Sequence, residues 1–397
     1  MTADVFAPAR LGPLTLRNRI IKAATFEGRS YRGQVTEDLV AFHEAVARGG
    51  AAMSTVAYCA VSPDGRVFRH CLVLDADTVP GLRKLTDAVH AHGAAAAAQL
   101  GHAGLVADAM SNKQKSLAPS RRFSPVAKGV VPAATPRDLA RVRDDFVAAA
   151  RYALEAGFDC LEVHLGHNYL LSSFLSPNLN RRTDSYGGDI EGRARFPREV
   201  LRAVRDAVGD RAAVTAKLNM SDGVPGGLWL DESIEVARML QGDGTVDALQ
   251  LTGGSSLLNG MYFFRGEVPL DDFAGTQPRA LRPVVKPLLR RILPEYPFEE
   301  AFFLPYARQF RVAVDLPLIL LGGINRLDTV QQAVADGFAF VAMARALLRD
   351  PDLVNKLQAG ASSESLCIHC NKCAPTIYDH AGTHCVLPSL TAESTAQ

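Results

Sequence analysis

Short apolar runs alternate with longer amphipathic stretches along most of this chain. The runs predict eight strands, at Arg19–Ala24, Ala52–Tyr58, Ala95–Leu100, Cys160–Leu165, Ala213–Leu218, Ala248–Thr252, Leu318–Leu321 and Ala339–Met343. Apolar residues three or four positions apart predict helices between them, at Thr36–Arg48, Pro80–His92, Pro136–Ala156, Ile190–Val208, Asp231–Gln241, Ala301–Val314 and Leu327–Ala335. Strands that alternate with helices in this way are typical of a parallel sheet covered by helices.

Eight strands, most of them followed by a helix, predict the α/β fold class and a (β/α)₈ TIM barrel. A doubly wound sheet is the alternative, and it usually has a Gly-x-Gly-x-x-Gly turn after its first strand. Residues 19–28 contain no such turn. The segment Val5–Leu16, with Gly12-Pro13 at its centre, predicts an N-terminal hairpin that plugs the barrel floor. The barrel is expected over residues 1–355, with a short cysteine-rich extension over 356–397.

Two connections after strands are long enough to carry specificity. They are expected as loops, at Gly101–Thr135 after the third strand and from Gly253 to about Glu300 after the sixth. In TIM barrels the loops that follow the strands form the face where substrates bind.

Composition excludes several classes of partner. Lys and Arg number 43 against 42 Asp and Glu, so the chain lacks the basic excess of a protein that follows a nucleic-acid backbone. No apolar run approaches the ~18 residues of a membrane span, and Met1–Phe6 has no secretory leader pattern. We therefore expect a cytoplasmic protein without nucleic-acid or membrane partners. The sequence does not decide whether the protein forms a homo-oligomer.

The most informative stretch follows the fourth predicted strand. His164, His167 and Tyr169 lie within six residues. Imidazole N–H groups can bind a substrate oxygen and a phenol can deliver a proton, so this spacing indicates a site that polarises and protonates a substrate. The alternative is structural, with the histidines capping a loop and the tyrosine filling a crevice.

Other polar residues follow neighbouring strands at the same end of the barrel. Gly322-Gly323 and Arg345 come after the seventh and eighth strands, where barrels commonly bind phosphate. Gln99 and Lys217 end the third and fifth strands and point into the mouth. A buried lysine needs a negative partner, which the N1–C2=O2 edge of a reduced flavin would supply.

Several motifs together resemble the old yellow enzyme family, the NADH:flavin oxidoreductases that include FMN-dependent ene-reductases on a (β/α)₈ barrel. The motifs are Asn18–Ile21, Gln99–Gly104, His164–Leu170, Phe174–Pro177 and Asn180–Gly188. The resemblance covers about residues 6–351.

The resemblance implies a role for each candidate site residue. His164 and His167 would hold the electron-withdrawing oxygen of a small enone-like substrate over FMN, and Tyr169 would protonate Cα after hydride passes from flavin N5 to Cβ. NAD(P)H would be the reductant. The remaining FMN-binding positions are expected at the ring (Ala24, Thr25, Gln99, Lys217) and at the phosphate (Gly322, Gly323, Ala344, Arg345).

Four positions depart from the family pattern. Asn168 replaces a glycine before the tyrosine, and Ala344 replaces a glycine before the phosphate-binding arginine. Lys217 replaces the commoner arginine. It keeps the positive charge but cannot form the two parallel hydrogen bonds of a guanidinium. Phe26 stands where a hydroxyl or thiol near flavin O4 belongs, although Thr25 can serve after a small shift, so the flavin potential stays undetermined.

The C-terminal extension contains a compact cysteine motif. Cys367, Cys370 and Cys373 form C-x₂-C-x₂-C, and Cys385 follows. This is a good ligand set for a [4Fe–4S] cluster, as in the dienoyl-CoA reductases and trimethylamine dehydrogenases that the motif resembles. A Cys₄ zinc site and an empty vestige are the alternatives.

The leading hypothesis is an FMN-dependent reductase of activated C=C bonds that uses NAD(P)H. A second hypothesis keeps the fold but reverses the chemistry, with oxidative C–N or C–H cleavage and electrons leaving through the cluster to a partner protein. A third is a non-catalytic flavin- or metal-binding protein. The histidine pair with Tyr169 argues against the third, because a scaffold has no use for a proton donor.

Overall fold

The computed structural model describes residues 4–388 and closes the eight predicted strands into a barrel. The strands are β3 (Ile20–Lys22), β4 (Met53–Ala60), β6 (Ala95–Gly101), β9 (Cys160–Leu165), β10 (Ala213–Asn219), β11 (Ala248–Thr252), β12 (Leu318–Leu321) and β13 (Phe340–Met343). They pair in parallel in chain order, and β13 pairs with β3, which closes the ring. A two-residue strand, β5 (Leu72–Val73), pairs with β4 outside this ring. The barrel prediction is confirmed.

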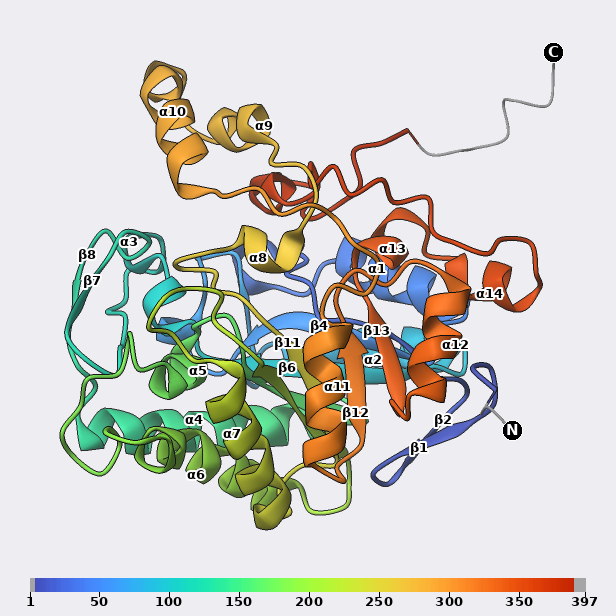
Figure 1. Cartoon of the computed structure of the whole chain (residues 1–397), viewed down its shortest axis with the longest axis horizontal. Helices are drawn as coiled ribbons and strands as arrows, with labels where there is room; N and C mark the ends of the chain where they lie inside the picture. Colours follow the sequence, from blue (N-terminus) through green and yellow to red (C-terminus); the bar gives the residue numbers. More distant parts are fainter. Residues whose placement is uncertain (1–3, 389–397) are drawn as a thin grey trace.

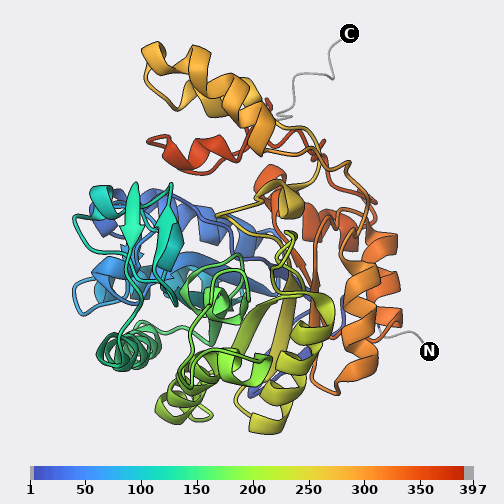
Figure 2. The same cartoon turned by 60° about the vertical axis from the view of Figure 1, so that its left-hand side comes forward.

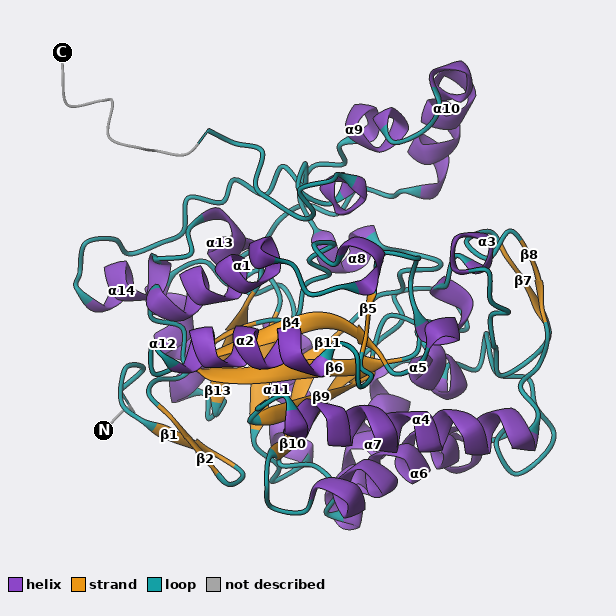
Figure 3. Ribbon diagram, turned by 180° about the vertical axis from the view of Figure 1, so that it is seen from behind, coloured by secondary structure: helices purple, strands orange, loops and turns teal. Residues whose placement is uncertain are grey.

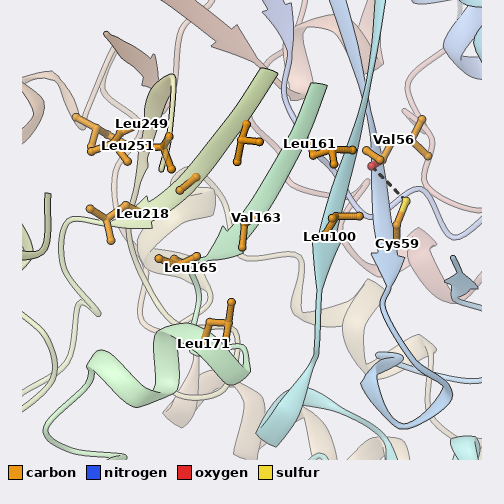
Figure 4. Close-up of a cluster of buried hydrophobic side chains, with 14 of the residues drawn as sticks. Val56, Cys59, Leu100, Leu161, Val163, Leu165, Leu171, Leu218, Leu249 and Leu251 are labelled. Atoms are coloured by element: carbon orange, nitrogen blue, oxygen red, sulfur yellow. Dashed lines mark hydrogen bonds between the residues drawn. The ribbon is translucent and has the colours of Figure 1, made fainter. Parts of the chain in front are cut away.

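Seven predicted helices surround the barrel (Figure 1). They are α1 (Glu37–Arg48), α2 (Val79–His90), α4 (Pro136–Glu155), α6 (Ile190–Val208), α7 (Leu230–Asp243), α11 (Leu304–Ala313) and α12 (Leu327–Ala335). The outward side chains of the strands, among them Leu161, Val163 and Leu165, are fully buried in the main apolar core (Figure 4). Burying a leucine is worth about 1.5–3 kcal/mol, so this layer holds the helices to the barrel.

The helix starts follow from local chemistry that the sequence already shows. Thr135 and Asp138 form a reciprocal capping box at the start of α4, with Pro136 at its first position. The Thr36 side chain accepts a hydrogen bond from the Leu39 N–H at the start of α1. Each cap satisfies donors that a helix N-terminus otherwise leaves unpaired.

The floor of the barrel is closed by an N-terminal hairpin, β1 (Ala9–Leu11) with β2 (Leu14–Leu16). Leu11 and Leu16 join a second apolar cluster made of the inward side chains at the lower end of the strands, including Ala97, Cys160 and Phe340. Small side chains on several strands leave room for the leucines. The predicted plug is therefore present, seen below the barrel in Figure 1.

The two long connections are not plain loops, which corrects the sequence prediction. The first contains α3 (Ala109–Asn112) and an antiparallel hairpin, β7 (Arg122–Ser124) with β8 (Gly129–Val131), at the side of the molecule in Figure 3. The second contains α8 (Met261–Phe264), α9 (Leu270–Gly275) and α10 (Arg282–Ile292). These elements are short or interrupted by proline, so their periodicity is too weak to stand out.

The C-terminal segment crosses the face of the barrel on which the α9–α10 pair lies (Figure 2). After α13 (Arg345–Arg349) and α14 (Leu353–Gln358) the chain runs beneath the α9–α10 pair to the short helix η5 (Pro375–Tyr378), as Figure 2 shows. Thr383 then pairs with the loop after β3, because its N–H donates to Glu27 O at 2.7 Å. Among the helices of residues 4–388, none has the length and apolar character needed to cross a membrane.

We expect Leu11→Ala to destabilise the protein by about 2–5 kcal/mol, because a fully buried side chain leaves a cavity in the plug. Thr15→Ala, on the exposed side of the same hairpin, is the matched control and should change stability by less than about 0.5 kcal/mol. Urea unfolding measures both. Equal effects of the two substitutions would contradict the plug.

Candidate active site

A polar layer lies directly above the apolar floor inside the barrel. Gln99 pairs in register with Glu162, and Lys217 pairs with both His164 and Gln250. Side chains alternate along a strand, so these residues face inward like Ala97, Cys160, Ala213 and Ala248 below them. Four neighbouring strands thus bring the predicted Gln99, His164 and Lys217 together at the mouth.

The three proposed catalytic side chains form one cluster. The ring centroids of His164 and Tyr169 are 4.6 Å apart, and those of His164 and His167 are 5.6 Å apart. His164 lies next to the end of β9, whereas Tyr169 directly precedes α5 (Leu170–Leu175). Neither His164 Nδ1 nor His167 Nδ1 has a hydrogen-bond partner within the described chain. The cluster therefore has free nitrogen atoms available to a ligand.

Burial sets the protonation of all three groups. It lowers the pKa of His167 to about 3 and that of His164 well below its usual range, with the positive Lys217 acting in the same direction. Burial raises the pKa of Tyr169, and the nearby Cys71 and Tyr378 act in the same direction. At neutral pH the site holds two neutral imidazoles and a protonated phenol, so it offers N–H and O–H donors without a net charge.

Backbone geometry explains why an asparagine suits position 168, between His167 and Tyr169. His167 and Asn168 have φ of 59° and 58°, in the left-handed region that asparagine tolerates better than most residues. Asn168 Nδ2 donates to Asp222 Oδ1 at 3.0 Å. Asn219 donates to the same oxygen, and its own Oδ1 accepts from the His167 N–H at 3.0 Å. Asn168 therefore replaces glycine and is stabilised by this buried network.

Glu162 is a site residue that the sequence analysis missed. Gln99 Nε2 donates to Glu162 Oε1 at 2.7 Å, and Lys217 Nζ lies 3.4 Å from the same oxygen. The negative partner that Lys217 requires is thus present in the protein, which corrects the argument that a flavin must supply it. The alternation of Cys160, Glu162 and His164 on one strand was the available signal.

The residues present nevertheless fit a flavin ring. Gln250 Nε2 is buried at the level of Lys217 and lacks a hydrogen-bond partner among the described residues, as do the two histidine nitrogens. Orphaned buried donors are rare in proteins and mark places where a bound group completes the hydrogen bonding. A heteroaromatic ring with carbonyl and nitrogen acceptors meets that need, with Lys217 and Gln99 beside it.

The loop after β3 is fixed by a buried ion pair. Lys22 Nζ and Glu27 Oε1 are 2.6 Å apart, and Glu27 Oε2 accepts from the Ala57 N–H at 2.7 Å. Lys22 also donates to Thr25 Oγ1 at 3.2 Å, so the Thr25 hydroxyl is already engaged. Ala24 and Phe26 pack in the same apolar cluster as Tyr169. The expected flavin-facing loop therefore lies next to Tyr169.

The proposed phosphate site follows β12 and β13, across the mouth from β9. Gly322 and Gly323 have positive φ, and an added Cβ would meet the rings of Phe303 and Phe302 at 2.5 Å. Arg345 Nη1 donates to Arg265 O at 3.0 Å and to the Asn371 side-chain oxygen. No carboxylate in residues 4–388 pairs with Arg345. The charge of this half-buried guanidinium therefore remains available for an anion beside Ala344.

The four cysteines of the extension are half-buried and free. Cys367, Cys370 and Cys373 are close enough to Arg345 to affect the pKa of its guanidinium. The pKa of Cys373 is raised to about 11, chiefly by burial and also by the neighbouring thiols, while the positive charge of Arg345 opposes the rise. Over residues 4–388, no three His, Cys, Asp or Glu side chains have an arrangement that holds a metal ion. A cluster at these thiols therefore stays a prediction.

Two aromatic residues complete the site and were not predicted. Tyr58 lies 5.3 Å from Tyr169 between ring centroids, and its hydroxyl donates to Gly65 O at 3.0 Å. Gly101 leaves room for it, since a Cβ there would lie 2.5 Å from the Tyr58 ring. The ring centroids of Phe263, on α8, and His167 are 4.4 Å apart. Tyr58 lies on β4 and Phe263 on α8, and their contacts with Tyr169 and His167 form only in the closed barrel, so no local pattern reveals them.

Comparison with known proteins identifies this architecture. Residues 4–251 match the family model described as NADH:flavin oxidoreductase / NADH oxidase. The chain belongs to this family. The old yellow enzyme resemblance is therefore confirmed, and FMN and a nicotinamide nucleotide are the cofactors that family membership supports.

Three similar proteins show the range of the family. A 4,4'-dithiodibutanoate disulfide reductase from Rhodococcus erythropolis is 65% identical over 97% of this chain and 95% of its own length. A multifunctional alkene reductase/demethylase OYE from Caballeronia cordobensis is 31% identical over 90% of this chain. A structure of morphinone reductase superimposes with a TM-score of 0.71 at 25% identity, over 93% of this chain and 92% of its own. This chain covers 49% of the alkene reductase/demethylase, and about half of several other relatives of the family.

Stability should fall as the pH is lowered from 7 to 5, and the fall should be smaller in His167→Gln. An unfolded histidine binds a proton near pH 6.5, whereas the pKa of folded His167 is about 3, so acid favours the unfolded state throughout this window. Urea unfolding at several pH values measures the slope. His380→Gln, at an exposed position, should retain the slope of the unmodified protein. Equal slopes for all three proteins would contradict a buried neutral His167.

Proposed function

We propose that this protein is an FMN-dependent oxidoreductase that uses NAD(P)H to reduce the S–S bond of a small organic disulfide. One observation carries the choice of acceptor, namely the 65% identity over nearly the full length of both chains with a 4,4'-dithiodibutanoate disulfide reductase. The neutral donors and aromatic rings at the mouth of the barrel also support a disulfide as the acceptor, because they suit a small polarisable molecule.

FMN, when bound, accepts a hydride from NAD(P)H and returns the electron pair to the acceptor. His164 and His167 orient the acceptor by N–H hydrogen bonds and stabilise charge that develops on the leaving sulfur. Tyr169 and Tyr58 enclose it and exclude water. In the balanced reaction the S–S bond breaks and two S–H bonds form, as one disulfide, one NAD(P)H and one proton give two thiols and NAD(P)⁺.

The protein's own thiols near the site are poor exchange nucleophiles. Burial raises the pKa of Cys71, which packs beside Tyr58 and Tyr169, to about 12. Thiol–disulfide exchange needs a thiolate, so Cys71 is almost entirely inactive at neutral pH. This favours direct reduction by the flavin over a mixed disulfide with the protein.

A second candidate function is the reduction of activated C=C bonds, such as those of enones. The spacing of His164, His167 and Tyr169 favours it, because paired N–H donors polarise a carbonyl and the adjacent phenol protonates Cα. The similarity to an alkene reductase/demethylase also supports this activity. Both reactions use the same reductive step and differ in the acceptor.

Tyr169→Phe separates the two candidates. A carbanion needs a proton from the enzyme, whereas a thiolate is a weak base that leaves without one. We expect alkene reduction to slow by about 10²–10⁴-fold and disulfide reduction by less than about tenfold. Stopped-flow reoxidation of the reduced enzyme measures both, and reduction by NADPH is the internal control. Failure of disulfides alone to reoxidise the enzyme would reject the leading proposal.

We keep a [4Fe–4S] cluster at Cys367, Cys370, Cys373 and Cys385 as a proposal, with zinc as the alternative. The four half-buried thiols beside a half-buried arginine suit an anionic cluster. Anaerobically purified protein should contain about four iron and four sulfide per chain. Cys370→Ser should lower both contents, and Cys71→Ser should leave them unchanged. Stoichiometric zinc without sulfide would favour the alternative, and an electron-transfer partner would then be excluded at this site.

A further inference from the structure

A wall of aromatic side chains runs outward from the apolar cluster that contains Tyr169. Phe26 and Val67 pack in one cluster with Tyr169. Phe68 lies 5.3 Å from Phe26 and 6.1 Å from Tyr378 of the extension, measured between ring centroids. The loops after β3 and β4 and the C-terminal extension thus share one surface that leads away from the reacting site.

The outer end of this wall is a stack of rings. Tyr31 stacks on His70 at 5.0 Å and on His380 at 5.5 Å. His70 in turn lies 6.0 Å from Phe68. The stack is anchored from both sides, since Thr383 accepts from Arg29 at 3.0 Å and its N–H donates to Glu27 O.

Three arginines surround that outer end. The backbone N–H of Arg32 donates to His70 Nδ1 at 2.9 Å, and its guanidinium carbon lies 5.2 Å from the centre of the Tyr31 ring. Arg69 Nε donates to His70 Nε2 at 3.0 Å. The Arg66 guanidinium donates to Pro63 O at 3.0 Å and to Arg69 O at 3.5 Å. In the part of the chain that the structure describes, none of the three arginines forms an ion pair with a carboxylate.

Two acids near these arginines are already neutralised elsewhere. Asp64, on the same loop as Arg66, is held by Arg141 at 2.6 Å. Asp108, whose N–H donates to Val67 O, pairs with Lys128 at 3.3 Å. After burial, the positive charges of Arg69 and Arg32 are the largest cause of a lowered pKa at His70. The rim therefore carries an uncompensated positive charge next to the aromatic wall.

We propose that Arg32, Arg66 and Arg69 bind the carboxylate of the substrate while the aromatic wall holds the chain that joins the carboxylate to the sulfur. The substrates are then small disulfides with acid tails. This inference rests on the proposed function and extends it, because it assigns the rim a ligand class. The 4,4'-dithiodibutanoate in the name of the relative has this chemistry, with a carboxylate at each end.

An anion at the rim has a second source in the 2'-phosphate of NADPH. Guanidinium groups bind phosphate and carboxylate by the same charge-assisted hydrogen bonds. The geometry favours the substrate, since the wall begins at Tyr169, where the acceptor reacts. The test separates the two sources by comparing NADPH with NADH.

Arg66→Gln combined with Arg69→Gln tests the proposal in the FMN-loaded enzyme. For 4,4'-dithiodibutanoate we expect KM to rise by about tenfold for each arginine removed. KM for neutral 2-hydroxyethyl disulfide, and kcat for both, should stay within about twofold. Arg151→Gln, an exposed arginine on α4, is the matched control and should change nothing. Equal changes for the two disulfides, or an effect confined to KM for NADPH, would overturn the proposal.

A binding measurement makes the result independent of turnover. The thioether 4,4'-thiodibutanoate has both carboxylates but no reducible bond, so calorimetry reports its affinity for the oxidised holoenzyme directly. Weaker binding to the double variant than to Arg151→Gln supports the arginine rim even if no disulfide is turned over. Equal binding to both variants would show that the rim does not recognise the acid, whichever reaction the enzyme catalyses.

Discussion

The parallel register of β9 with its two neighbours is the constraint on which the site depends. It places Glu162 between Gln99 and Lys217, so that one buried carboxylate joins three strands. A buried charge is stable only when it is paired and hydrogen-bonded. A shift of one residue in β9 would turn both Glu162 and His164 into the apolar core, so barrel closure and active-site assembly are one event.

The same mouth combines two kinds of chemistry because its two sides differ in charge. Around His164, His167 and Tyr169 the groups are neutral, since burial opposes any charge there. The side proposed for phosphate contains the half-buried guanidinium of Arg345, and the proposed rim contains Arg32, Arg66 and Arg69. A ligand with anionic ends and a reducible centre matches this distribution, with its charges at the edges and its reacting atoms in the neutral centre.

Sequence reasoning recovered the barrel, the floor hairpin and the strand that contains His164, because each is encoded locally. The eight apolar runs, the Thr135–Asp138 cap and the His164–Tyr169 spacing need no knowledge of distant residues. It missed Glu162, Tyr58 and the rim arginines. Glu162 meets Gln99, Tyr58 meets Tyr169 and Arg32 meets His70 only when segments far apart in the chain come together. It also assigned the partner of Lys217 to a flavin, since a lysine at a strand end does not reveal which neighbouring strand holds the carboxylate.

The pairing of Thr383 with Phe26 and Glu27 joins the end of the described chain to its beginning. During translation the strands from β3 to β13 leave the ribosome well before this segment does. This contact can therefore form only after every strand of the barrel has been synthesised, so it joins the first loop of the barrel to the last segment of the described chain.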